Sequence, residues 1–137
     1  MRELRPKFES LRDFAAQVRR QQKQGYQIAF VEDDGEIRAV AGYRYLESLF
    51  SGKFLYVDDL VTRAHDRSRG FGGDLLDWLF KEAVAHGCAR LELDSGVQRA
   101  EAHRFYFSKR MVITSFHFGR SFQRSALVPP RLRAAGG

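Results

Sequence analysis

The residues best suited to chemistry lie in one short segment, residues 67–73, with the sequence Arg-Ser-Arg-Gly-Phe-Gly-Gly. Glycine lets the backbone adopt positive φ angles and approach a ligand closely, so several peptide N–H groups can converge on one anion. Apolar residues recur at helical spacing directly after this segment, and a helix N-terminus carries about half a positive charge. We therefore predict a phosphate or diphosphate site formed by Arg67, Ser68, Arg69, Gly70, Phe71, Gly72 and Gly73. The simpler interpretation is a glycine-rich turn between two elements.

Two common nucleotide-binding motifs fit this segment poorly. A P-loop requires the pattern G-x-x-x-x-G-K-[ST], which the chain lacks. A dinucleotide-binding fingerprint requires a third glycine, but here Asp74 and Leu75 follow Gly70-x-Gly72-Gly73. These mismatches weaken the prediction of a bound nucleoside triphosphate or dinucleotide.

The elements that position this segment are predicted from hydrophobic spacing and turn residues. Helical spacing predicts three helices, over residues 8–24, from Leu75 to a stop at Gly87, and from a Ser95–Gln98 capping box to Lys109. Strands are predicted over residues 26–32, 38–46, 54–62, 89–94 and 111–118, which are rich in aromatic and β-branched side chains. Asp33-Asp34-Gly35 between the first two strands predicts a tight hairpin turn.

This order of elements predicts an α/β fold. A strand–loop–helix–strand crossover of about 35 residues implies a parallel pair, at Val57 and Leu91, inside an otherwise antiparallel sheet with helices on its faces. Residues 1–124 are predicted to form one domain, and residues 125–137 a basic and flexible tail.

Length and composition restrict the class of protein. With 137 residues the chain is one domain that needs neither a disulfide nor a metal to fold, and no pair of histidines has the spacing of a metal site. The 23 basic and 17 acidic residues give a net charge of +6, which suits an anionic partner. The arginines are scattered, so nucleic-acid binding is the weaker interpretation. A single cysteine, Cys88, and the lack of a signal peptide or a long apolar run predict a cytoplasmic protein with no membrane partner.

Two motifs resemble those of the GNAT superfamily of acetyl-CoA-dependent N-acetyltransferases. Arg67-x-x-Gly70-x-Gly72 after a strand is similar to the family's [Q/R]-x-x-G-x-[G/A] signature, and Ala102-His-Arg-Phe-Tyr106 resembles its A-x-x-x-Y helix. The resemblance covers roughly residues 25–118 and implies a twisted, mostly antiparallel sheet with a splayed parallel strand pair and helices on both faces. It also implies acetyl-CoA as cosubstrate.

The resemblance assigns roles to individual residues. Backbone N–H groups of residues 68–73 would bind the CoA diphosphate, and the pantetheine arm would pair with the strand at Leu60, Val61 and Thr62. An N–H group near Leu60 would stabilise the oxyanion of the reacting thioester. Tyr106 would lie beside the cofactor sulfur and protonate the departing thiolate, although a simple packing role is the alternative. Two departures from the family pattern stand at Arg99, where asparagine is common, and at Arg110-Met111, where Gly-Phe is common.

Asp58 and Asp59 are the candidate residues for the amine acceptor. On a regular strand two adjacent residues face opposite sides of the sheet, so one carboxylate would bind or deprotonate the amine. The alternative for either is an edge position or an ion pair with an arginine. Cys88 has no base beside it, so direct attack of the amine without an acyl-enzyme is expected. A non-catalytic acyl-CoA sensor is the alternative function, and an edge strand or the last strands would allow a homodimer.

Overall fold

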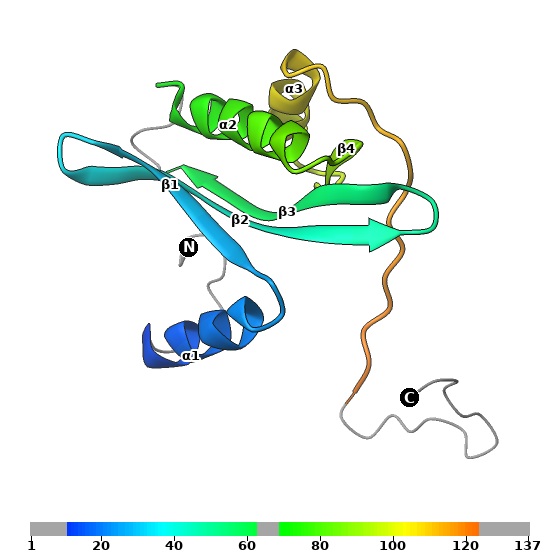
Figure 1. The fold of residues 1–137 in the computed structure, drawn as a ribbon, viewed down its shortest axis with the longest axis horizontal. Coiled ribbons are helices and arrows are strands. Elements are labelled where there is room, and N and C mark those ends of the chain that lie inside the picture. Colours follow the sequence, from blue (N-terminus) through cyan, green and yellow to red (C-terminus); the bar gives the residue numbers. More distant parts are fainter. Residues whose placement is uncertain (1–10, 63–68, 124–137) are drawn as a thin grey trace.

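The computed structural model describes residues 11–62 and 69–123, which form three helices and four strands (Figure 1). In chain order the elements are α1 (Leu11–Gln22), β1 (Gln27–Asp33), β2 (Glu36–Ser48), β3 (Gly52–Thr62), α2 (Phe71–Ala85), β4 (Arg90–Leu93) and α3 (Ala100–Ser108). The predicted tail at 125–137 and the start of the first predicted helix at 8–10 lie outside the described residues. No described helix combines the length and the apolar character needed to cross a membrane.

The sheet has the strand order β1-β2-β3-β4 and confirms the α/β fold class. β1, β2 and β3 pair antiparallel, and β4 pairs parallel to β3. Asp34 and Gly35 connect β1 and β2 with positive φ angles of 53° and 72°, as a two-residue hairpin turn requires. The register of the parallel pair differs by two residues from the predicted one, because Val57 lies opposite Leu93 and Leu55 lies opposite Leu91.

The hydrophobic core lies between the sheet and α2. The buried side chains of α2 are Leu75, Leu76, Leu79 and Ala83, and those of the sheet are Ala39, Ala41, Tyr43, Leu55 and Val57. Figure 1 shows α3 on the same side of the sheet as α2, with α1 on the opposite side. An ion pair connects α3 to α2, since Nζ of Lys109, the C-cap of α3, lies 3.0 Å from Asp77 Oδ1 on α2. This arrangement places the first turns of α2 and α3 next to the end of β3.

A β-bulge interrupts the regular alternation of β3. Gly42 of β2 lies opposite Asp59, whereas the next residue, Tyr43, lies opposite Val57, so Asp58 is an extra residue on β3. The bulge keeps Leu55, Val57 and Leu60 on the face that packs against α2, although their numbers change from odd to even. The prediction that Asp58 and Asp59 face opposite sides is therefore wrong, because a regular strand was assumed.

Two predicted details of the C-terminal half are also wrong. α3 begins at Ala100 with Arg99 as its N-cap and no side-chain cap, so Ser95–Gln98 forms a connection and not a capping box. Residues 111–123 contain no strand. A strand needs a hydrogen-bonded neighbour, and after Arg110, which has a φ of 64°, the chain continues as an extended segment that joins no strand of the sheet (Figure 1).

Candidate active site

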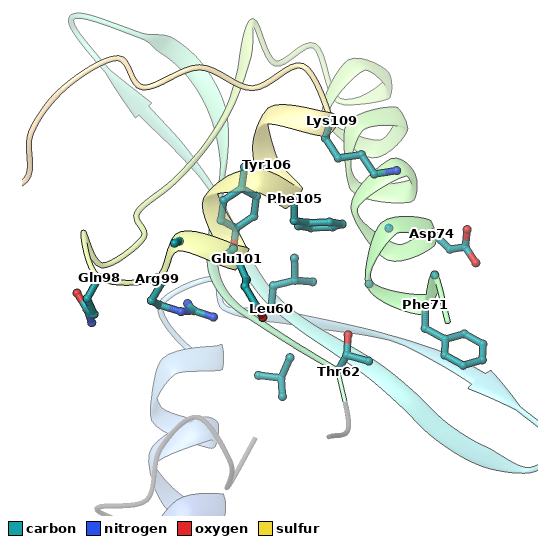
Figure 2. Close-up of a pocket in the computed structure, with 16 residues that line it drawn as sticks. Leu60, Thr62, Phe71, Asp74, Gln98, Arg99, Glu101, Phe105, Tyr106 and Lys109 are labelled. Carbon is teal, nitrogen blue, oxygen red and sulfur yellow. The ribbon is translucent and has the colours of Figure 1, made fainter. Parts of the chain in front are cut away.

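A large groove lies where β3 extends beyond its parallel partner. Its volume is about 1120 Å³, and its walls come from the end of β3 and the first turns of α2 and α3 (Figure 2). The lining residues are Leu60, Val61, Thr62, Gly70, Phe71, Gly72, Gly73, Asp74, Gln98, Arg99, Ala100, Glu101, Ala102, Phe105, Tyr106 and Lys109. The sequence predicts cofactor contacts at residues 60–62, at residues 67–73 and at Tyr106. Most of these residues line the groove, namely residues 60–62, residues 70–73 and Tyr106.

The groove opens because β3 and β4 pair over only a short stretch. The parallel register joins Phe54–Val57 to Arg90–Leu93, whereas β3 continues to Thr62. Within the described part of the chain, the β4-side edge of residues 58–62 therefore has no strand partner. Such an edge offers unpaired backbone N–H and C=O groups to an extended ligand.

The first turn of α2 supplies hydrogen-bond donors at one end of the groove. Gly70 is the N-cap, with a φ of 87° that favours glycine, and no side chain caps the helix. The Asp74 N–H donates to the Gly70 carbonyl at 3.0 Å, so the amides of residues 71–73 precede the first intrahelical hydrogen bond. A Cβ atom on Gly72 would lie 3.0 Å from Thr62 Oγ1, because this turn packs closely on the end of β3.

Positive charge flanks this turn. The Arg69 guanidinium lies 5.1 Å from the centroid of the Phe71 ring, and the Arg38 guanidinium lies 5.9 Å from it. Arg38 also forms ion pairs with Glu36 at 3.3 Å and Asp33 at 3.8 Å, so the helix N-terminus and Arg69 are the groups that make this end of the groove favourable for an anion. Arg67 and Ser68, the two other residues expected in this site, lie outside the described residues.

Tyr106 lies in the middle of the groove. Figure 2 shows its ring pointing from α3 toward Leu60, beside Phe105. Burial raises the pKa of the Tyr106 phenol, and the positive charge of Arg99 partly opposes that increase. The phenol is therefore protonated at neutral pH and can donate a proton into the groove.

Asp58 and Asp59 do not line the groove, because their carboxylates lie on the opposite face of the sheet. Arg44 donates to both oxygens of Asp58, at 2.9 Å from Nε and 2.8 Å from Nη2. The hydroxyl of Tyr26 donates to Asp59 Oδ2 at 2.7 Å in a buried hydrogen bond. Gly42 makes this bond possible, since a Cβ atom there would overlap the Tyr26 ring.

The comparison with known families decides what this site belongs to. Residues 1–111 match the family model described as the acetyltransferase (GNAT) family. The chain belongs to the GNAT family. The described motif positions Gly70, Gly72, Ala102 and Tyr106 all line the groove.

Individual relatives agree with this assignment. The GNAT chain is 40% identical over 88 residues to the uncharacterized N-acetyltransferase YhdJ of Bacillus subtilis (strain 168), an alignment that spans 64% of this chain and 62% of YhdJ. It thus covers less than two thirds of that relative. A putative acetyltransferase from Agrobacterium tumefaciens str. C58 has the same fold, with a TM-score of 0.76, 21% identity and 88% of each chain covered. Glucosamine-6-phosphate N-acetyltransferase from Arabidopsis thaliana gives a TM-score of 0.64 at 22% identity, covering 82% of this chain and 76% of its own.

Several lining residues of this GNAT groove were not singled out from the sequence. Lys109, the C-cap of α3, stands three residues after Tyr106, so a search for helical neighbours of Tyr106 at i+3 would have found it, and Phe105 directly precedes Tyr106 in the motif. No comparable pattern in the sequence identifies Gln98 and Glu101 as lining residues of the groove. Arg99, noted only as a departure from the family pattern, lines the groove and acts electrostatically on Tyr106.

Proposed function

We propose that this GNAT protein transfers an acetyl group from acetyl-CoA to a primary amine of a small molecule or protein. The observation that carries the proposal is the groove itself. The first-turn amides of α2 lie at one end of it, and a strand edge without a strand partner among the described residues forms its wall. A protonated phenol projects into it. Its volume of about 1120 Å³ suits a ligand larger than an ordinary metabolite.

The cosubstrate would bind through backbone groups. The amides of residues 68–73 and the side chains of Arg67 and Arg69 would hold the diphosphate at the N-terminus of α2. The pantetheine arm would extend β3 by pairing with Leu60, Val61 and Thr62, whose edge has no strand partner among the described elements. The thioester would then lie where the pairing of β3 with β4 ends.

The reaction would proceed by direct attack of the neutral amine on the thioester carbonyl. An N–H group near Leu60 would stabilise the tetrahedral oxyanion, a contribution of about 3 kcal/mol for one well-placed donor. Collapse of this intermediate breaks the C–S bond, and Tyr106 would protonate the departing thiolate. Cys88 packs against the hydrophobic core and does not line the groove, which supports a reaction without an acyl-enzyme.

The acceptor amine would approach from the face of the sheet opposite α2. Asp59 and Asp58 supply negative charge on that face, and a protonated amine is attracted by it. Arg44 binds both carboxylate oxygens of Asp58, and Asp59 is buried and accepts the Tyr26 hydroxyl, so both would act on the ammonium group through their charge. Both residues remain candidate substrate carboxylates.

Calorimetry with acetyl-CoA and a thiol-release assay test this function together. We expect a 1:1 complex whose affinity falls as salt is added, and thiol release that depends on one class of primary amine. The amine panel contains aliphatic monoamines, diamines, amino acids and a lysine-containing peptide. Desulfo-CoA, which lacks the thiol, is the binding control. Absence of binding at millimolar acetyl-CoA would reject the cosubstrate, and binding without release for every amine would favour the sensor alternative.

Two further properties are part of the proposal. We place the protein in the cytoplasm, where a reducing environment keeps the single Cys88 as a thiol. A homodimer would cover the edge of β4, which has no second strand neighbour in the described ranges, or the exposed apolar side chains of Val112, Phe116 and Phe118. Light scattering of the purified chain measures this association directly.

A further inference from the structure

We infer that His117 and Asp94 form the proton-accepting site for the amine, with Tyr56 holding the Asp94 carboxylate in place. The inference rests on the proposed N-acetyltransferase function and assigns its missing base. Its basis is the position of these three side chains at the point where β3 and β4 separate.

The three side chains form a continuous chain of contacts. The Tyr56 hydroxyl donates a hydrogen bond to Asp94 Oδ2. The other carboxylate oxygen, Oδ1, lies 3.5 Å from His117 Nδ1. Because Nδ1 is the ring nitrogen near the carboxylate, we assign Nε2 as the atom that accepts a proton, as in a histidine base that an aspartate positions.

The position of this site follows from the strand register. Tyr56 lies opposite Glu92 in the last part of the parallel pairing, and Asp94 directly follows Leu93, the last β4 residue paired to β3. The Asp94 carboxylate is therefore fixed beside the opening between the two strands. The cosubstrate thioester is proposed to lie in the same opening.

The site also lies on the correct face for an acceptor. Val57 and Leu93 pack toward α2, so the alternating residues Tyr56 and Asp94 point to the opposite face. Tyr106 packs on the α2 side. A thioester between β3 and β4 would thus meet the acid Tyr106 on one side and His117 on the other.

The neighbouring charged groups are engaged elsewhere. Arg44 lies 5.6 Å from the centroid of the Tyr56 ring and binds both oxygens of Asp58, and the Oε2 atom of Glu92 lies 3.6 Å from Arg90 Nε. Asp59 accepts the Tyr26 hydroxyl. The side chain of His117, in contrast, is 75% exposed and accessible to an incoming amine.

The proton balance of the step is simple. The ammonium group gives one proton to His117 Nε2, and the resulting neutral amine attacks the thioester carbonyl to form the C–N bond. The C–S bond then breaks and the thiolate takes a proton from Tyr106. The attacking nitrogen releases its second proton to the Tyr106 phenolate through solvent, which restores the phenol and leaves a neutral amide. His117 gives its proton to solvent. The carboxylate of Asp94 stabilises the imidazolium while it exists.

The test compares His117→Gln with His86→Gln. The second variant carries the same substitution at an exposed histidine, the C-cap of α2. The acceptor is the best amine from the panel that tests the proposed function. At saturating acetyl-CoA we expect His117→Gln to lower kcat/KM for the amine about 100-fold or more, with the affinity for acetyl-CoA unchanged. The acid limb of the wild-type pH–rate profile should disappear. His117→Ala should regain activity when imidazole is added, because the position is open to solvent.

Each outcome separates this inference from the proposed function. A His117→Gln protein that matches His86→Gln in rate and pH profile overturns the base assignment and leaves the N-acetyltransferase function intact. A loss that keeps the acid limb and is not rescued by imidazole indicates a structural role and also overturns it. If the wild-type protein releases no thiol with any amine of the panel, the function and this inference are refuted together.

Discussion

A charge series at Gly72 tests the diphosphate site most directly. The residue has ordinary helical φ, and a Cβ atom would lie 3.0 Å from Thr62 Oγ1, a contact relieved by a shift of a few tenths of an ångström. Gly72→Ala should therefore change the Kd of acetyl-CoA little, and Gly72→Asn should weaken it through added volume. Gly72→Asp has nearly the same shape as Gly72→Asn and adds one negative charge.

The extra effect of that charge can be worked out from Coulomb's law. Two unit charges about 6 Å apart repel by about 0.7 kcal/mol at the dielectric constant of water and about 2.8 kcal/mol at an effective value of 20. A diphosphate presents two such charges, so the Asp variant should bind roughly 10- to 10⁴-fold more weakly than the Asn variant.

Isothermal calorimetry at low and high salt measures this difference. The Debye length falls from about 10 Å at 0.1 M salt to about 3 Å at 1 M, so the gap between Gly72→Asp and Gly72→Asn should narrow as salt is added. Thermal melts confirm that each variant is folded. Equal affinities for the Asn and Asp variants would refute the placement of a diphosphate at the N-terminus of α2.

The remaining predictions concern the acid, the opposite face of the sheet and alkaline stability. Tyr106→Phe should lower kcat more than it changes acetyl-CoA affinity, since only the proton donor is lost, and an unchanged kcat measured by thiol release would remove the general-acid role. Gly42→Ala should lower the free energy of unfolding by more than Tyr26→Phe, because its Cβ atom would overlap the Tyr26 ring. Tyr26→Phe removes one buried hydrogen bond to a carboxylate and should cost about 1–3 kcal/mol; urea melts compare the two. Burial raises the pKa of Tyr45 to about 12, from about 10 in an unfolded chain. The folded state therefore holds the phenolic proton more tightly, and the free energy of unfolding should fall as pH rises from 10 toward 12. In urea melts at a series of pH values, Tyr45→Phe should make this fall with pH less steep. The same dependence on pH in both proteins would contradict the prediction.

Features fixed by neighbouring residues could be predicted from the sequence. The Asp34-Gly35 turn follows from the tolerance of these residues for positive φ, and Gly70 takes the left-handed conformation for the same reason. The parallel pairing of β3 and β4 follows from the long connection between them. Parallel strands need a crossover of a dozen or more residues, usually through a helix, and the chain between these two strands contains one. The two family motifs could locate the groove because each is a local pattern. One stands at the junction between β3 and α2, and the other lies on α3.

Features that depend on distant partners could not be predicted. The bulge at Asp58 arises from the register between β3 and β2, which no local pattern in either strand reveals. Ser95 has the spacing of a capping residue, yet its Oγ atom is buried without a hydrogen-bond partner among the described residues. Residues 111–118 alternate like a strand, but alternation does not supply a neighbouring strand to bind. The contact of His117 with Asp94 joins segments that are far apart in the sequence.

The single additional residue in β3 has a consequence for how such a protein can be altered. Asp58 is inserted one step after Val57, the last β3 residue paired with β4, and a bulge bends and twists the strand that contains it. Strand length, more than side-chain identity, thus determines where the two strands diverge. Replacing amino acids one at a time would leave that geometry in place, whereas shortening the strand by one residue would straighten it and favour continued pairing. Variants of this protein are therefore expected to tolerate substitution at position 58 better than deletion of it.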